Sequence, residues 1–249
     1  MNRDALHDAL NELLKPKLFK DYCPNGLQVQ GKSEIKKVIT GVTASQALIE
    51  RAIEAQADAI LVHHGYFWKN EPAVVTGMKH QRLKTLLEHD INLFAYHLPL
   101  DAHPQLGNNA QLAKVLGICC AQAVSDRPTE LMWQGELAQT MDEDDFAELL
   151  LNELDFKPTV VSANKPIKTV AWCTGGAQSM IAEAARLGVD AYISGEISES
   201  TAHAAVELGV HYFAAGHHAT ERFGVKALGD YLIEHYALDV AFIDLPIPV

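Results

Sequence analysis

Histidines and carboxylates follow three apolar segments of the chain, where an α/β sheet usually carries its chemistry. In such sheets, ligands bind beyond the carboxyl ends of the parallel strands. Imidazole and carboxylate groups are also the donors that zinc and other transition metals prefer. The sequence therefore predicts a metal site at these strand ends. Its predicted ligands are His63, His64, Asp101, His217 and Glu221.

The segment GHHATE is the sharpest local signal. If a helix begins near Gly216, His217 and Glu221 stand at positions i and i+4 and share one helix face. The alternative is a surface turn in which Glu221 pairs with Arg222 or with solvent.

His63 and His64 are neighbours, and on an ideal strand their side chains would point to opposite faces. At a strand end that breaks into Gly65, this objection relaxes, because glycine gives the backbone freedom to turn. The pair alone is a weak signal.

His97 and Asp101 form a third piece, His-x-x-x-Asp. Pro99 lies between them and argues against a helix, so an extended loop is expected to carry Asp101 towards the site. We predict His97 to be the catalytic proton carrier, or to orient a ligand by hydrogen bonding. It could also be a ligand itself, or a buried histidine bonded to the backbone.

Five protein ligands are too many for one open tetrahedral site, and they suit two metal ions about 3.5–4 Å apart. We therefore expect two divalent metal ions per subunit. Mixed imidazole and carboxylate donors do not distinguish zinc, iron, manganese, nickel and cobalt. The roles of His218 and Glu196, which are polar residues near expected strand ends, stay open.

Other motifs indicate little chemistry. Thr174-Gly175-Gly176 lacks the pattern of a phosphate-binding loop, and its glycines are expected to let a helix and a strand pack closely. Phe67-Trp68 could line a pocket, but packing in the core is the favoured interpretation. The four cysteines contain no C-x-x-C pair, which favours reduced, mostly buried thiols.

The expected elements alternate between strands and helices, which predicts an α/β fold with mostly parallel sheets covered by helices. Expected helices include 4–19, 44–56, 78–89 and 142–154. Residues 38–64 match residues 170–196 without a gap at an offset of 132, for example at Asp58 and Asp190. We infer two similar halves from an internal duplication, 1–125 and 126–249.

Composition excludes several classes of function. The net charge of −12 disfavours binding to nucleic acid or to an anionic membrane surface. No apolar stretch approaches the length of a membrane span, and no export signal is visible, so a cytoplasmic location is expected.

The motifs YCPNGLQVQG, ADAILVHHGYFWK, HLPLDAH and AAGHHATER together resemble the bacterial members of the NIF-three-like family, over residues 20–249. Members are commonly described as GTP cyclohydrolase I type 2 homologues. The resemblance implies two intertwined α/β halves with the metal site between them, and a homohexameric toroidal ring. It also implies a dinuclear site on the five ligands above. The chain reads His97-Leu98-Pro99-Leu100-Asp101 where relatives often read H-T-N-L-D.

We expect a dinuclear-metal-dependent hydrolase of a nucleotide-like or other small phosphorylated substrate. The alternative is a ring-shaped metal-binding scaffold without turnover. A third interpretation is a stable α/β protein whose histidines bind nothing. Turnover of nucleotides or phosphoesters would separate the first two.

Overall fold

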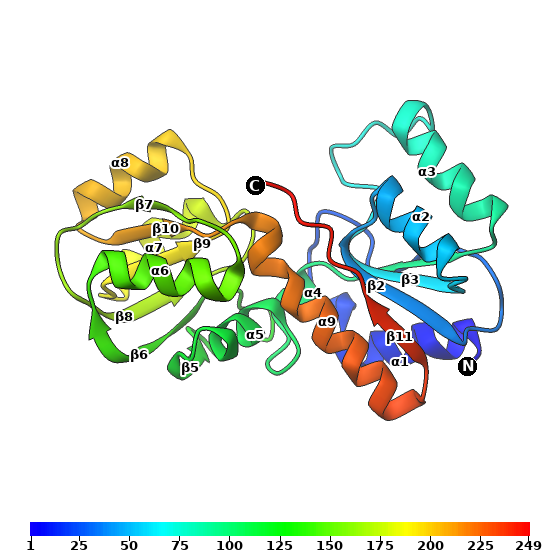
Figure 1. Cartoon of the computed structure of the whole chain (residues 1–249), viewed down its shortest axis with the longest axis horizontal. Helices are drawn as coiled ribbons and strands as arrows, with labels where there is room; N and C mark the ends of the chain where they lie inside the picture. Colours follow the sequence, from blue (N-terminus) through cyan, green and yellow to red (C-terminus); the bar gives the residue numbers. More distant parts are fainter. The chain divides into compact units, whose positions relative to one another are not determined.

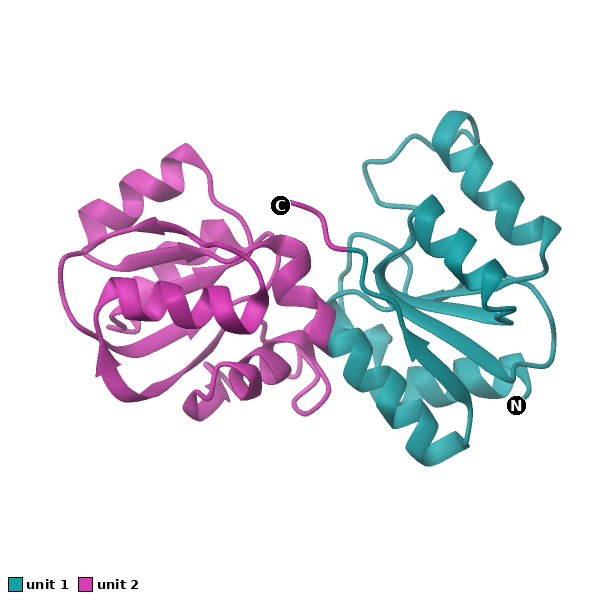
Figure 2. Cartoon of the chain, in the orientation of Figure 1, with its two compact units in different colours: residues 1–100, 224–245 teal, residues 101–223, 246–249 magenta.

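The computed structural model describes all residues from 1 to 249, and they form two compact units (Figure 2). Unit 1 contains residues 1–100 and 224–245, and unit 2 contains residues 101–223 and 246–249. These units differ in their bounds from the predicted halves, 1–125 and 126–249. The halves were defined by the sequence repeat, and the duplication that they imply stays a prediction. Helix α9 (His217–Tyr236) begins in unit 2 and ends in unit 1.

Unit 1 is built on a five-stranded sheet in the order β1-β4-β3-β2-β11. Figure 1 labels β2, β3 and β11 of this sheet. Strands β4, β3, β2 and β11 are parallel, and β1 lies antiparallel to β4 at the edge. The strands are β1 (Gly26–Val29), β2 (Lys37–Thr43), β3 (Ala59–His64), β4 (Asn92–Ala95) and β11 (Asp239–Phe242). The helices are α1 (Arg3–Leu14), a 3-10 turn (Pro16–Leu18), α2 (Gln46–Glu54) and α3 (Gly77–Glu88).

Alternating residues of β2 cover the two faces of this sheet. Ile39 packs in the cluster that includes Leu48 and Ile49 of α2. Thr40 points the other way, and its side chain lies 3.2 Å from the position that a Cβ on Gly229 of α9 would take. A helix therefore covers each face of the strand, as expected for a parallel sheet.

Unit 2 is built on a six-stranded sheet in the order β5-β6-β8-β9-β10-β7. Only β8, β9 and β10 are parallel, and β7 and β6 flank them antiparallel. The strands are β5 (Cys119–Ala123), β6 (Trp133–Met141), β7 (Thr159–Val161), β8 (Ile167–Trp172), β9 (Ala191–Ser194) and β10 (His211–Ala214). The helices are α5 (Asn108–Val115), α6 (Glu143–Leu154), a 3-10 turn (Gln178–Met180), α7 (Ile181–Arg186) and α8 (Glu199–Leu208). The short helix α4 (Leu98–Asp101) precedes them.

Two apolar clusters lie on the two faces of this second sheet. One face packs Val170 and Trp172 against Phe146 and Leu150 of α6. The other packs Ala171 and the strands beside it against α7 and α8. The predicted fold class, an α/β protein with parallel strands covered by helices, is confirmed.

The N-terminal helix is shorter than predicted. It ends at Leu14 rather than near residue 19, and Lys15 adopts a left-handed conformation with φ of 49°. Pro16 explains the early stop, because its ring disfavours the helical region for the preceding residue. None of the helices combines the length and apolar character that crossing a membrane requires.

Candidate metal centre

Three imidazole rings gather in unit 1 at the end of β3. The ring centroids of His63 and His64 lie 4.5 Å apart, and those of His63 and His97 lie 5.0 Å apart. Ligand nitrogens from all three residues lie within 4.8 Å of one another. The strand end therefore brings both adjacent histidines into one cluster, as the sequence predicted for them.

Each of these rings uses Nδ1 in a hydrogen bond within unit 1. His63 donates from Nδ1 to the carbonyl oxygen of Tyr96 (3.0 Å), because a carbonyl can only accept. The Nδ1 of His64 bonds the hydroxyl of Thr43 (3.2 Å), and that of His97 bonds the carboxylate of Asp21 (2.6 Å). Because Nδ1 of each ring is engaged in a hydrogen bond, Nε2 is the nitrogen that can bind a metal or transfer a proton, as in many histidine sites.

Asp21 is the residue that sequence reasoning missed in this cluster. Besides His97, its carboxylate accepts from the backbone N–H groups of Tyr22 and Leu98 and from the amide of Asn25. Burial raises its pKa, but hydrogen bonding to His97 and Asn25 outweighs this and holds the pKa below its usual value. Asp21 is therefore a charged anchor that fixes the orientation of His97.

The segment from Leu98 to Asp101 is a short helix, α4, and not the extended loop predicted from Pro99. The prediction was wrong because Pro99 lies in the first turn. Residues there need no intrahelical partner for their N–H groups, so a proline is tolerated.

Asp101 is fixed within unit 2 and is only 5% exposed. Its Oδ1 accepts from the amide of Asn108 (2.8 Å) and from the hydroxyl of Thr174 (3.4 Å). Its backbone carbonyl accepts from the amide of Asn109 (3.2 Å). The two neutral donors Asn108 and Thr174 fix the orientation of the Asp101 carboxylate.

His217 and Glu221 meet as predicted, because α9 begins at His217 and places them one turn apart. The Nε2 of His217 lies 3.1 Å from Oε2 of Glu221, and its Nδ1 bonds Glu196 at 2.7 Å. Burial alone would lower the pKa of His217, but the carboxylates of Glu221 and Glu196 raise it to about 9. Glu196 therefore supports His217 as Asp21 supports His97.

Gly175 makes the room for this arrangement. Its φ is +67°, and a Cβ there would lie 1.9 Å from Oε1 of Glu221 and 3.1 Å from Nε2 of His217. The predicted role of this glycine in helix–strand packing was incomplete, since the space it leaves holds the Glu221 carboxylate. The sequence offered one signal for this role, because Gly175 follows an expected strand at the edge where the predicted ligands lie.

Two further expectations need correction. Cys119 and Cys120 are exposed rather than buried, because β5 is an edge strand, while Cys23 and Cys173 are buried free thiols. Trp68 lies beside the site and not in the core, with its ring centroid 5.0 Å from that of His97.

The donors fit a metal centre on their own chemistry. The carboxylate oxygens of Asp101 and Glu221 lie within 4.8 Å of each other, and both residues are buried. Two buried carboxylates at that separation repel each other, and positive charge nearby offsets the repulsion. Protonated His217 supplies part of that charge beside Glu221, and a divalent cation held by the clusters of His, Asp and Glu would supply more.

The predicted residues thus fall into two donor sets. His63, His64 and His97 belong to unit 1, and Asp101, His217 and Glu221 belong to unit 2. Their union in one dinuclear centre stays a prediction. His218 is buried in the first turn of α9, and its backbone N–H donates to the carbonyl of Val249 (3.4 Å).

The chain is similar to known proteins over its whole length. It is 56% identical over 252 residues to the "GTP cyclohydrolase 1 type 2 homolog" of Vibrio cholerae, covering 100% of both chains. A solved structure described as "protein ybgI, unknown function" has 52% identity and a TM-score of 0.95, again over 100% of both chains. The structure of TTHA1606 from Thermus thermophilus has 33% identity and a TM-score of 0.91, with the same coverage. The model of the Duf34/NIF3 (NGG1p interacting factor 3) family matches residues 1–247, and the chain belongs to that family.

Proposed function

We propose that the chain is a hydrolase that depends on two divalent metal ions and acts on a nucleotide-like or other small phosphorylated substrate. The observation that carries this proposal is the close pair of buried carboxylates, Asp101 and Glu221, whose oxygens lie within 4.8 Å of each other. The relatives named as GTP cyclohydrolase homologues support the nucleotide-like substrate class. The proposed ligands are His63, His64, Asp101, His217 and Glu221.

Two divalent ions on such donors supply Lewis acidity and lower the pKa of water, which is what hydrolysis at neutral pH needs. The donors accept zinc, iron, manganese, nickel or cobalt. His97 is the proposed proton carrier. Its Nδ1 is held by Asp21, so Nε2 is the atom that would accept a proton from the attacking water. The Asp21 carboxylate would stabilise the imidazolium that forms.

The metal count per subunit tests whether the two donor sets act together. Untagged protein is loaded with zinc, manganese or iron, desalted, and analysed for bound metal and for turnover of GTP and simple phosphoesters. Wild type is expected to hold about two equivalents, as in two-metal hydrolases. His63→Ala/His64→Ala and Glu221→Ala are expected to lose both ions and all turnover.

The pattern of loss separates one shared centre from two separate ones. If each variant loses a single ion and keeps the other, the two donor sets bind metal independently and the shared centre is wrong. Full turnover without metal contradicts the hydrolase proposal as well. Lys36→Gln, at an exposed lysine remote in sequence from every proposed ligand, is the control and should retain both ions.

A second candidate function is a ring-shaped metal-binding scaffold without turnover. The family description as an interacting factor favours it. The metal-loaded wild type distinguishes the two, because saturable binding of GTP or phosphoesters without any product indicates the scaffold. Product formation that disappears in His97→Gln, with metal content unchanged, indicates the hydrolase and the role of His97.

A further inference from the structure

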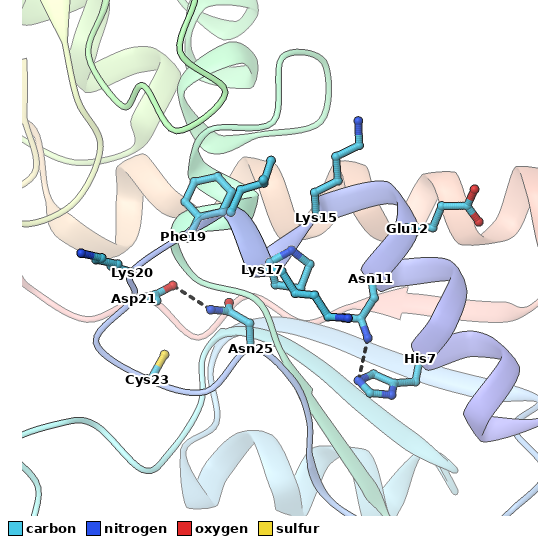
Figure 3. A pocket seen from close by; sticks show the side chains of 12 residues that line it. His7, Asn11, Glu12, Lys15, Lys17, Phe19, Lys20, Asp21, Cys23 and Asn25 are labelled. Atoms are coloured by element: carbon cyan, nitrogen blue, oxygen red, sulfur yellow. Dashed lines mark hydrogen bonds between the residues drawn. The ribbon is translucent and has the colours of Figure 1, made fainter.

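An open pocket of about 970 Å³ lies in unit 1 beside the C-terminal end of α1 (Figure 3). The pocket is lined by the last turns of α1 and by the segment from residue 15 to residue 25. Its size is within the range of pockets that bind small organic ligands. The proposed function does not use this pocket.

Three lysines, Lys15, Lys17 and Lys20, belong to its lining. They are exposed, and their ammonium groups make no ion pair and no side-chain hydrogen bond in the structure. In a chain with a net charge of −12, many other basic groups have acidic partners, such as Lys32 with Asp58 and Lys79 with Glu71. Three unpaired cations around one pocket therefore indicate affinity for an anion.

The pocket also offers apolar and aromatic surface. Figure 3 shows the ring of Phe19 between Lys15 and Lys20, and the carbon atoms of Pro16 and Leu18 line the same pocket. Leu18 is 53% exposed, although it is a large apolar residue. An inorganic anion alone would leave this surface uncovered, whereas a ligand with a planar or apolar body would cover it.

Two residues of the pocket lining also hold His97. Asp21 and Asn25 line the pocket, and the backbone N–H of His97 donates to Oδ1 of Asn25 (2.7 Å). Their polar atoms are committed to each other and to His97, so they favour no anion themselves. Glu12 is the other carboxylate of the lining, and the three lysines outnumber it.

We propose that this pocket is a binding site for a phosphorylated ligand with a planar or apolar body, of which a nucleoside triphosphate is a representative. The lysines would bind the phosphate oxygens, and Phe19 would stack on the planar part. The site lies on the Nδ1 side of His97, whereas metal binding would use Nε2. Binding therefore needs no metal and does not depend on the proposed hydrolase activity.

The test is equilibrium binding of fluorescent GTP to protein kept in EDTA, followed by fluorescence anisotropy. Wild type is expected to bind saturably, and Lys15→Gln/Lys17→Gln/Lys20→Gln is expected to bind about tenfold more weakly, equivalent to about 1.4 kcal/mol. The matched control, Lys36→Gln/Lys157→Gln/Lys226→Gln, removes the same charge at exposed lysines outside the pocket and should stay within about twofold of wild type, as a distant screened charge predicts. Phe19→Ala should weaken GTP binding but leave inorganic triphosphate binding unchanged.

Several results would overturn the proposal. Equal losses in both triple variants would mean that only net charge matters, and saturable binding of uncharged guanosine with the affinity of GTP would exclude the lysines. A third contrary result is that GTP binds only when metal is added and that this binding is lost in His63→Ala. This result would place the anion at the metal donors instead. Failure of the hydrolase proposal, by contrast, would leave the result in EDTA unchanged.

Discussion

The strand after the first crossover helix ends differently in the two units. In unit 1, β3 ends in His63-His64, and at the offset of 132 residues β9 of unit 2 is followed by Gly195-Glu196. The edge strands are arranged alike in the two units, because β1 and β7 each pair antiparallel with the last parallel strand of their sheet. Similar frameworks thus present imidazoles in one unit and a carboxylate in the other.

The hydrogen bonds that hold the histidines differ less between the two units than the candidate metal ligands do. His97 carries a carboxylate on Nδ1 in unit 1, from Asp21, and His217 carries one in unit 2, from Glu196. The two carboxylates come from unrelated places, since Asp21 precedes β1 and Glu196 follows β9. This comparison indicates that one histidine in each unit has an anionic partner, although the partner comes from a different part of the chain. A duplication accounts for these parallels, and it stays a prediction.

The largest expected difference between the units is at Gly175 and its counterpart Thr43. Gly175→Ala forces a Cβ against the Glu221 carboxylate at a positive φ, so we expect a loss of about 2–4 kcal/mol in the free energy of unfolding, from overpacking and left-handed strain. Thr43→Ala removes only one hydrogen bond, to His64, and should cost less than about 1 kcal/mol. Urea denaturation of metal-free protein measures both.

Metal content of the same two variants sharpens this contrast. Gly175→Ala should also displace Glu221 and reduce bound metal, while Thr43→Ala should retain it. Equal and small effects on unfolding in both variants would show that the structure relaxes around residue 175, and the role assigned to its missing side chain would be wrong.

A smaller difference is expected between the two carboxylates that support the histidines. Asp21→Asn removes a buried charge with several donors, so we expect a loss of about 1.5–3 kcal/mol. Glu196→Gln acts at a side chain that is 44% exposed and should change stability by less than about 0.5 kcal/mol. It should, however, lower the pKa of His217 from about 9, because Glu196 helps to raise it.

Proton NMR titration of the His217 ring in metal-free protein measures that pKa, and urea denaturation measures the stabilities. Asp21→Glu is the control for charge alone, because it keeps the carboxylate but moves it. If Glu196→Gln left the pKa of His217 unchanged, Glu221 alone would control that ring and the proposed parallel between the units would fail.

Most of the fold and the donor types could be predicted from the sequence, because strand ends and the i, i+4 spacing are local signals. His217 and Glu221 meet because a helix starts where GHHATE predicted it. Asp21 and Gly175 could not be predicted in their roles. Asp21 reaches His97 across 76 residues of sequence, and the φ of Gly175 depends on its tertiary surroundings. Pro99 led to the wrong prediction of an extended loop. A proline is tolerated in the first turn of a helix, and the sequence alone did not show that Pro99 lies in one.

The smallest difference between the units is expected at Asp58 and Asp190, which match at the offset of 132 and perform the same task in both units. Oδ2 of Asp58 accepts from the backbone N–H groups of Lys36 (2.9 Å) and Lys37 (3.1 Å). Oδ2 of Asp190 accepts from the corresponding N–H groups, each at 3.0 Å. Burial raises the pKa of each carboxyl, but these hydrogen bonds outweigh it and hold both below the usual value.

We expect Asp58→Asn and Asp190→Asn each to lower the free energy of unfolding by about 1 kcal/mol at pH 7. Because the folded-state pKa is depressed, the stabilisation is present above the unfolded pKa of about 3.9 and is lost as pH falls through the folded value. The difference between wild type and each variant should therefore shrink below pH 4, as measured by urea denaturation between pH 3 and pH 7. A difference as large at pH 3 as at pH 7 would show that the aspartates act through packing and not through charge. Unequal losses at pH 7 would mean that the two units do not share this support.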